Sequence, residues 1–324
     1  MGLLARIFSG KDEHPPPPQP VQVLAQDGRV FALLPSGRLA AWSTESGDLL
    51  WDVQAAGPRI AVQGDRLLDG HGVCRSVSDG QVLWESGQAG LPVSLGERLA
   101  ILGWQRLWLE GEGGHHALPE LDPSPELDTW LHQGRLMGID HESRTLFWLD
   151  PQEPNITLGA DGPPIRGGAL FGERIVVIRE RQGQSWDLEL EDMEPLPRWH
   201  AQLLGVGPDC SLGVEKRSYR ALDHLSSTSW SLSGNIPNAP CILRIGEVIV
   251  AETWQGLAIC RPGQERPELI ELPLGRRQQR PISAHRPIVQ IGPQQVALAA
   301  WPPLLVDLST GRRVPVLAPP PPAH

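Results

Sequence analysis

The sequence predicts an all-β protein built as a single β-propeller of four-stranded antiparallel blades. A turn that contains glycine returns along the chain at nearly even spacing, which is typical of a repeat architecture. The residues after each turn favour strands, and no long segment shows a helical period with caps. The 12 Trp beside 1 Tyr and 4 Phe indicate one structural tryptophan in many of the repeats.

The spacing of the turns predicts the number of blades. Successive glycines are 36, 32, 38, 38, 35, 39 and 46 residues apart. A blade of four short strands with its turns needs about 40 residues, and stacking such sheets around a ring covers the apolar faces that one sheet would expose. Eight blades are therefore favoured, with seven as the alternative. The glycines are Gly28, Gly64, Gly96, Gly134, Gly172, Gly207, Gly246 and Gly292.

The strand after a turn is in places continuously apolar. Residues 174–178 (RIVVI) carry four apolar side chains in a row. Since alternate side chains of a strand point to opposite faces, such a run indicates a strand that is buried on both faces. A strand between two neighbouring blades has that environment.

Proline-rich segments bound the predicted propeller. Residues 1–20 form a flexible leader that ends in a stiff linker containing Pro15 to Pro18 and Pro20, and residues 318–324 form a Pro-rich tail. The propeller is expected over residues 21–317. Within the leader, Leu3, Leu4, Ile7 and Phe8 would lie on one side of a short amphipathic helix. The leader is either a docking peptide or a frayed end.

Charge and hydropathy exclude several classes of partner. The net charge of −10 argues against nucleic-acid binding, which needs a basic surface. No stretch approaches the ~20 apolar residues of a membrane span, and Arg6 interrupts the short N-terminal apolar run. We therefore expect a cytoplasmic protein with no membrane span, and no cofactor or metal is predicted. The four cysteines contain no CxxC pair and are expected to be free thiols.

One segment carries a recognisable repeat. Residues 38–51 read RLAAWSTESGDLLW, which resembles the repeat of quinoprotein-like (PQQ-type) β-propellers, Ala-x-Asp-x-x-Thr-Gly-x-x-x-Trp. Ala41, Gly47 and Trp51 are in register, whereas Ser43 and Ser46 replace the family Asp and Thr. The resemblance implies an eight-bladed ring in which Trp51 packs between adjacent blades.

Other repeats match this pattern less completely. The second keeps Gly80 and Trp84, and the resemblance implies the same role between blades for them. The last keeps Gly311 but has Pro315 where the Trp belongs, and the sixth has Trp230 one residue early. WD40 repeats are the rival family, but Trp-Asp pairs occur without the upstream Gly-His of that repeat.

The sequence favours a binding scaffold over an enzyme. It contains no GxSxG, HExxH or P-loop motif, and His115-His116 has no identifiable further metal ligands. We expect a non-catalytic monomeric propeller that binds one or more protein partners within a complex, such as a bacterial multiprotein system. The alternatives are a quinone- or metal-dependent oxidoreductase that uses the central funnel, and a small-ligand sensor.

The best candidate for partner binding is a basic segment between the seventh and eighth repeats. This is where the spacing of the repeat is longest. Several arginines on an otherwise acidic protein can recognise an acidic partner. The candidate residues are Arg276, Arg277, Arg280 and Arg286.

Overall fold

A computed structural model describes residues 22–317 of the chain with internal gaps. The gaps are 56, 58, 119–126, 133–134, 141–144, 150–155, 159–164, 180–181, 189–191, 196–201, 234–235, 237–239, 272–287 and 300–301. The described residues form strands and turns. Among them, no helix is long and apolar enough to cross a membrane.

The strands form eight four-stranded sheets, each made of four consecutive strands. Blades 1 to 4 contain β1 (Gln22–Gln26), β2 (Arg29–Leu33), β3 (Arg38–Ser43), β4 (Leu49–Gln54); β5 (Ile60–Gln63), β6 (Arg66–Asp69), β7 (Val73–Ser76), β8 (Val82–Glu85); β9 (Leu91–Leu95), β10 (Arg98–Gly103), β11 (Arg106–Leu109), β12 (His115–Ala117); β13 (Leu127–His132), β14 (Arg135–Asp140), β15 (Thr145–Leu149) and β16 (Ile156–Leu158).

Blades 5 to 8 repeat the arrangement. They contain β17 (Ile165–Phe171), β18 (Arg174–Arg179), β19 (Gln182–Asp187), β20 (Met193–Pro195); β21 (Gln202–Gly207), β22 (Cys210–Glu215), β23 (Ser218–Asp223), β24 (Ser229–Leu232); β25 (Ile242–Ile245), β26 (Val248–Thr253), β27 (Gly256–Cys260), β28 (Glu268–Glu271); β29 (Ile288–Gly292), β30 (Gln295–Leu298), β31 (Leu304–Asp307) and β32 (Arg312–Val314). The prediction of an eight-bladed propeller is confirmed.

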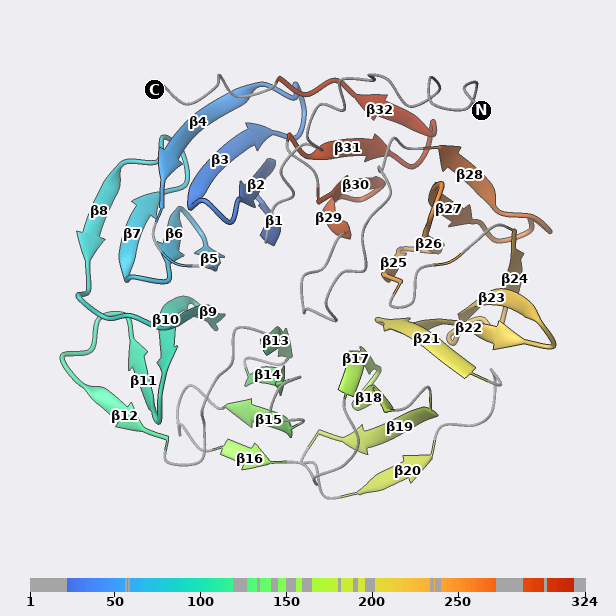
Figure 1. The fold of residues 1–324 in the computed structure, drawn as a ribbon, viewed down its shortest axis with the longest axis horizontal. Helices are drawn as coiled ribbons and strands as arrows, with labels where there is room; N and C mark the ends of the chain where they lie inside the picture. The colour runs from blue at the N-terminus through green and yellow to red at the C-terminus, as the bar shows by residue number, and fades with distance from the viewer. Residues whose placement is uncertain are drawn as a thin grey trace, which may run out of the picture.

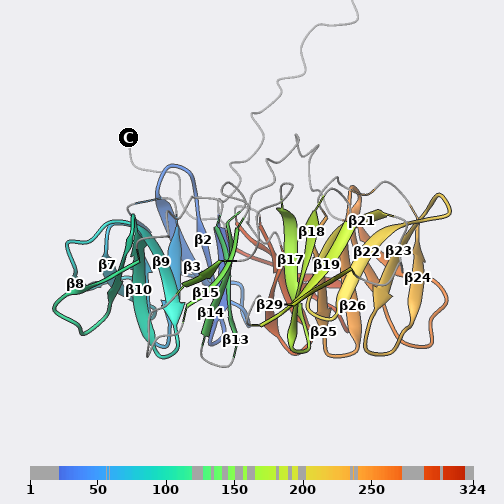
Figure 2. The same cartoon turned by 90° about the horizontal axis from the view of Figure 1, so that it is seen from below.

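The blades stand around a central axis in chain order. The first strand of each blade is innermost and the fourth is outermost, and blade 1 (blue) lies beside blade 8 (red) (Figure 1). Seen from the side, the ring is a disc one blade thick (Figure 2). Inner strands of neighbouring blades are in contact, as β5 is with β9 and β1 with β29.

The antiparallel pairing gives the disc two different faces. Turns between the first and second strands and between the third and fourth lie at one end of a blade, which we call the turn face. Turns between the second and third strands, and the connections to the next blade, lie at the other end, which we call the connection face. Any group placed on a turn can thus be assigned to one face.

Among the described residues, the repeated glycine lies in or directly before the first turn of its blade, as its spacing suggested; Gly134 lies outside them. Gly28, Gly64 and Gly96 have φ of 72°, 58° and 61°, a region that favours glycine. Gly207 and Gly292 differ, because each is the last residue of an inner strand and the turn itself begins with a proline. Proline fixes φ near −65°, which suits the first position of a turn.

The core lies between blades rather than within one layer. Phe31 and Leu39 of blade 1 form one apolar cluster with Ile60 and Leu67 of blade 2. The cluster that joins the two ends of the ring contains Trp42 of blade 1 and, from blade 8, the fully buried Ala297 and Leu305. Each sheet therefore buries its sides against its neighbours, which is what holds the ring together.

Candidate functional site

Trp51 of β4 lies against the next blade. In the strand register it pairs with Ala41, and only 7 % of its surface is exposed. Its indole Nε1 donates a hydrogen bond to the carbonyl of Val77, at 2.9 Å, in the last turn of blade 2. A Cβ added to Gly80 of that turn would lie 3.1 Å from the Trp51 ring. Gly80 therefore leaves the space that the indole occupies.

Trp84 occupies the matching position on β8 of blade 2. It pairs with Cys74, and its ring centroid is 5.7 Å from that of Trp108 of blade 3 at an interplanar angle of 53°. The side chain opposite each tryptophan is small and fully buried, Ala41 in blade 1 and Cys74 in blade 2. A small partner leaves room for the indole to reach the neighbouring sheet.

Two further turn glycines lie under the outer strand of the preceding blade. A Cβ on Gly47 of blade 1 would overlap the carbonyl oxygen of Pro315, which follows β32 of blade 8. A Cβ on Gly311 of blade 8 would lie 2.6 Å from Oε1 of Glu268 on β28 of blade 7. In blade 8, Pro315 thus takes the place that tryptophan has in blades 1 and 2.

Trp230 of blade 6 makes the same kind of contact and was not among the predicted site residues. It pairs with Ala221, and its Nε1 donates to the carbonyls of Arg261 at 3.2 Å and Gln264 at 3.1 Å in blade 7. Ser227 stands at the glycine position and has φ of 56°. The small residue nine positions before the tryptophan is the signal that identifies it.

The predicted arginine patch, Arg276, Arg277, Arg280 and Arg286, lies outside the described residues. The strands that flank it are described: β28 ends at Glu271 and β29 begins at Ile288. Both of these ends lie at the connection face, because a connection between blades starts and finishes there. Binding by these arginines remains a prediction.

Two exposed tryptophans identify the connection face as a candidate binding surface. Trp104 and Trp254 are 69 % and 45 % exposed. Each is the first residue of a two-residue Trp-Gln turn between the second and third strands of its blade. The blades concerned, 3 and 7, stand on opposite sides of the ring (Figure 1). Trp301 is in the corresponding segment of blade 8 but lies outside the described residues.

The sequence did not predict the exposure of Trp104 and Trp254, because the high tryptophan count was attributed to side chains packed between blades. Exposure depends on the strand register, and the pairs Gly103–Arg106 and Thr253–Gly256 place the indoles beyond the last ladder pair. The Trp-Gln dipeptide at equivalent places in two repeats was the available signal. Exposed tryptophan is unusual on a free surface and is enriched at centres of protein interfaces.

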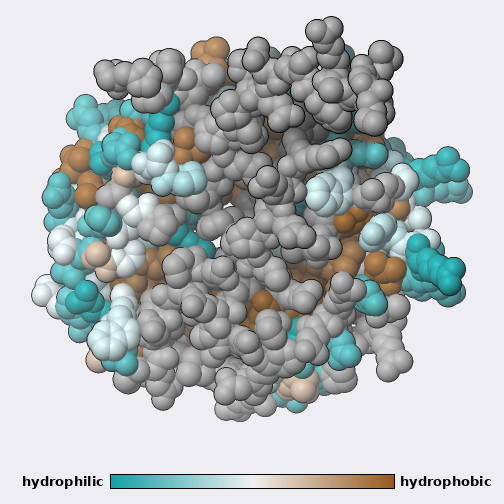
Figure 3. All heavy atoms as spheres, in the orientation of Figure 1, coloured by the Kyte–Doolittle hydropathy of each residue, from teal (hydrophilic) through white to brown (hydrophobic). Residues whose placement is uncertain are grey.

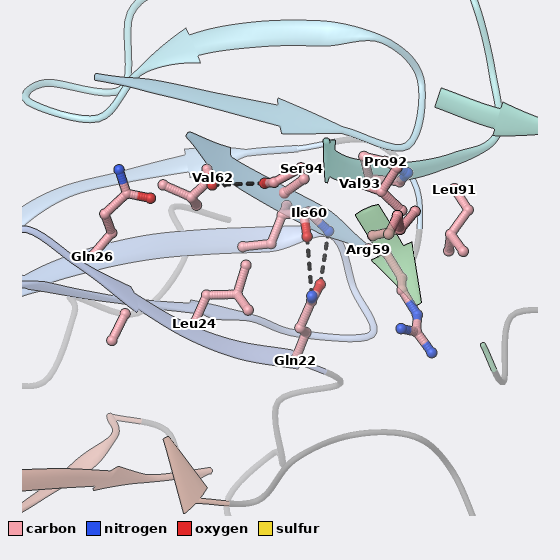
Figure 4. Close-up of a pocket in the computed structure, with 13 residues that line it drawn as sticks. Gln22, Leu24, Gln26, Arg59, Ile60, Val62, Leu91, Pro92, Val93 and Ser94 are labelled. Carbon is pink, nitrogen blue, oxygen red and sulfur yellow. Dashed lines mark hydrogen bonds between the residues drawn. The ribbon is translucent and has the colours of Figure 1, made fainter. Parts of the chain in front are cut away.

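A cavity of about 210 Å³ lies beside the central axis between the inner strands of blades 1 to 3. Gln22 spans two blades: its Nε2 donates to the carbonyl of Ile60 at 3.0 Å, and its Oε1 accepts from the Ile60 N–H at 2.7 Å. Ser94 Oγ donates to the carbonyl of Val62 at 2.8 Å (Figure 4). These bonds fix the polar wall, and the buried Arg59 supplies a cation to the lining.

The thiols lie mainly in the core. All four cysteines are free; Cys74, Cys210 and Cys260 are buried and Cys241 is half-buried. Burial raises the pKa of the Cys74 thiol to about 12, with a further contribution from the Glu110 carboxylate, and burial alone raises the pKa of Cys260 to about 12. Thiols with so high a pKa are poor nucleophiles at neutral pH.

Comparisons with known proteins support the fold. No protein-family model and no curated protein sequence matches the chain. Among solved structures, BamB from Moraxella catarrhalis is similar, with a TM-score of 0.55, 12% identity and coverage of 86% of this chain and 90% of that one.

Two other solved structures are less similar. The Cps50 (Swd1) β-propeller domain of Myceliophteria thermophila has a TM-score of 0.49 at 13% identity, covering 73% of this chain and 94% of that chain. The computationally designed Ika8 protein has a TM-score of 0.47 at 11% identity, covering 92% and 86%. At 12% identity the likeness to BamB shows the β-propeller fold alone, and membership of the quinoprotein-like family remains a prediction from the repeat residues.

Proposed function

We propose that the protein is a scaffold that binds a protein partner on the connection face of the ring, within a larger complex. The observation that carries the proposal is the exposure of Trp104 and Trp254, at 69 % and 45 %, on that one face. Tryptophan loses little conformational entropy on binding and buries a large area, so it commonly dominates the energy of an interface. A partner that contacts both must span the opening of the ring.

The rigidity of the ring supports a binding role. Each blade is held to its neighbours by apolar clusters and by indole hydrogen bonds such as that of Trp51. Turns on such a frame keep fixed positions, so a partner can contact several at a small entropic cost. The arginines predicted to bind a partner follow β28 of blade 7, the blade that also carries Trp254.

The test compares partner recovery by three full-length chains, the unchanged protein and two variants. Trp104→Ala with Trp254→Ala removes both indoles, and Leu225→Ala removes an apolar side chain that is 61 % exposed on the turn face. Truncating a dominant interface residue costs about 2 kcal/mol or more, roughly 30-fold in Kd. Cross-linking in the native cell followed by quantitative capture should recover less partner with the double variant alone. Equal recovery with all three chains would refute the proposal.

The cavity beside the axis supports a second function, binding of a small ligand. Its volume of about 210 Å³ accommodates a few heavy atoms, and amide, hydroxyl and guanidinium groups line it. A ligand that binds only the folded chain raises its thermal midpoint. A thermal-shift screen with small anions and polar metabolites tests this, and Gln22→Ala is the variant that should lose the response.

A further inference from the structure

The outermost strands of blades 1 and 2 carry exposed aliphatic side chains at matching positions. Leu50 of β4 is 41 % exposed, and Val82 and Leu83 of β8 are 49 % and 50 % exposed. We call these three residues the rim patch. In both blades a β-bulge interrupts the pairing with the third strand and leaves a leucine, Leu50 or Leu83, unpaired. A bulge redirects side chains, which explains the shared exposure.

The two parts of the rim patch lie on the outer strands of neighbouring blades. Trp51, next to Leu50, packs over Gly80, which lies two residues before Val82. The outer strands β4 and β8 therefore adjoin on the circumference (Figure 1). Hydrophobic side chains are visible at the left margin of the disc, where β8 lies (Figure 3). Exposed apolar side chains on an unpaired edge strand favour association with another segment.

An apolar segment of the sequence precedes the first described strand. Residues 3–8 include Leu3, Leu4, Ile7 and Phe8, and the described structure begins at Gln22 on the innermost strand of blade 1. From the first to the fourth strand of a blade is about 14 Å, three spacings of ~4.8 Å. The six residues from Pro15 to Pro20 span about 19 Å at ~3.1 Å each when extended. Because β1 begins at the connection face and β4 and β8 begin at the turn face, the leader must also cross the thickness of the disc, about 17 Å for five residues at ~3.4 Å each. The 13 residues from 9 to 21 span up to about 40 Å at ~3.1 Å each, which covers both distances.

The charge of Arg6 in the leader is opposite to that of the carboxylates beside the rim patch. Arg6 stands between the leader's apolar pairs. Exposed carboxylates flank the rim patch: Asp48 precedes β4, Asp79 precedes β8, and Glu85 ends β8. An arginine at the edge of an apolar contact gains from such neighbours, although each exposed pair contributes only ~0–1 kcal/mol.

We propose that residues 3–8 of the leader dock on the rim patch of their own chain. Tethering favours this occupant, because a linker long enough to span the distance makes docking intramolecular and raises the effective concentration of the leader. A contact that is weak between separate molecules is then well populated within one. The docked leader covers the apolar rim, and a partner that captures the leader would uncover it.

Hydrogen exchange of backbone amides tests the proposal on the full chain. Ile7→Asp places a charge in the leader, and Ser9→Asp adds the same charge outside the apolar cluster as the matched control. We expect Ile7→Asp to speed exchange in residues 81–85 of β8 several-fold, whereas Ser9→Asp does not. Exchange in β28, whose Leu269 is 38 % exposed on the rim of blade 7, should be the same in all chains.

A second experiment examines the contact from the other side. A labelled peptide of residues 1–12 should bind a chain that lacks residues 2–12 and bind the full chain at least tenfold more weakly, since the tethered leader competes. Leu83→Asp in the shortened chain should abolish peptide binding. Unchanged exchange with Ile7→Asp overturns the proposal. The proposal is also overturned if the protection of β8 rises with protein concentration and sedimentation shows a dimer, because the occupant is then a second copy.

Discussion

Trp42 donates its indole N–H to the carbonyl of Leu317, at 2.9 Å across 275 positions of sequence. Leu317 in turn donates its own N–H to the carbonyl of Gly47, at 3.0 Å. Blade 1 contains the first four described strands and blade 8 the last four, so no sheet of the described residues combines the two ends of the chain. Residues 315–317, which follow β32 and lie on blade 1, therefore add to the apolar cluster that closes the ring.

Shortening the chain after Val314 should therefore destabilise the whole ring. The Trp42→Phe variant loses the indole hydrogen bond and part of a fully buried ring, and should lower the free energy of unfolding by about 1–2 kcal/mol. The truncation should cost more. Urea unfolding followed by circular dichroism measures both changes. Trp104→Phe, at an exposed turn, is the control and should stay within about 0.5 kcal/mol of the unchanged chain.

Gly80→Ala should be more destabilising than Gly64→Ala. Both glycines have positive φ, 73° and 58°, so both variants carry a similar backbone penalty of about 1 kcal/mol. A Cβ at position 80 also meets the Trp51 ring at 3.1 Å, whereas nothing lies within 4 Å at position 64. The difference between the two unfolding free energies, expected at about 1–2 kcal/mol, measures the crowding against Trp51. Equal losses would show that the indole moves freely aside.

The blade number was predictable because a four-stranded sheet sets the spacing of its turns. Gly28, Gly64 and Gly96 recur for a local reason, positive φ at the first turn, and local requirements leave a local sequence pattern. Trp51 and Trp84 were recognisable for a similar reason, since each follows a turn glycine by four residues.

The contacts that close the ring and form the surfaces were not predictable from one sequence. Nothing near Leu317 indicates a bond to Trp42, because the two meet only after seven other sheets have determined where the ends lie. Pro315 breaks the repeat and yet occupies the tryptophan position through its backbone carbonyl. Exposure of Trp104 or Leu83 depends on a turn and a bulge whose register the composition does not reveal.

Thiol labelling should distinguish the half-buried Cys241 from the other cysteines. The pKa values of Cys74 and Cys260 are raised to about 12, and burial also raises that of Cys210, so little thiolate is present at pH 8. We expect Cys241 to react first with an aromatic disulfide reagent and the other three only as the chain unfolds. Cys241→Ser should remove the fast phase. A second fast thiol in that variant would contradict the burial of the blade cores.

The carboxylate of Asp307 should make the last blade sensitive to acid. It accepts hydrogen bonds from Ser309 Oγ at 2.5 Å and from the Ser309 and Thr310 N–H groups at 2.8 and 3.1 Å. The bond from the Ser309 hydroxyl, followed by those from the backbone, holds the pKa of Asp307 below its usual value. Because the folded pKa is lowered, the stabilisation is present above the ordinary Asp value of about 3.9 and is lost as pH falls through the folded pKa.

Unfolding midpoints measured between about pH 6 and pH 2.5 test this sign, because the ordinary Asp pKa of about 3.9 lies inside that range. Asp307→Asn cannot titrate, so its stability relative to the unchanged chain should improve as pH falls below about 4. The change is expected to be small, since Asp307 is only half-buried and solvent screens its interactions. Glu247→Gln removes another exposed carboxylate, in the first turn of blade 7, and controls for net charge. If both variants show the same pH dependence, general charge rather than the Asp307 turn determines the acid response.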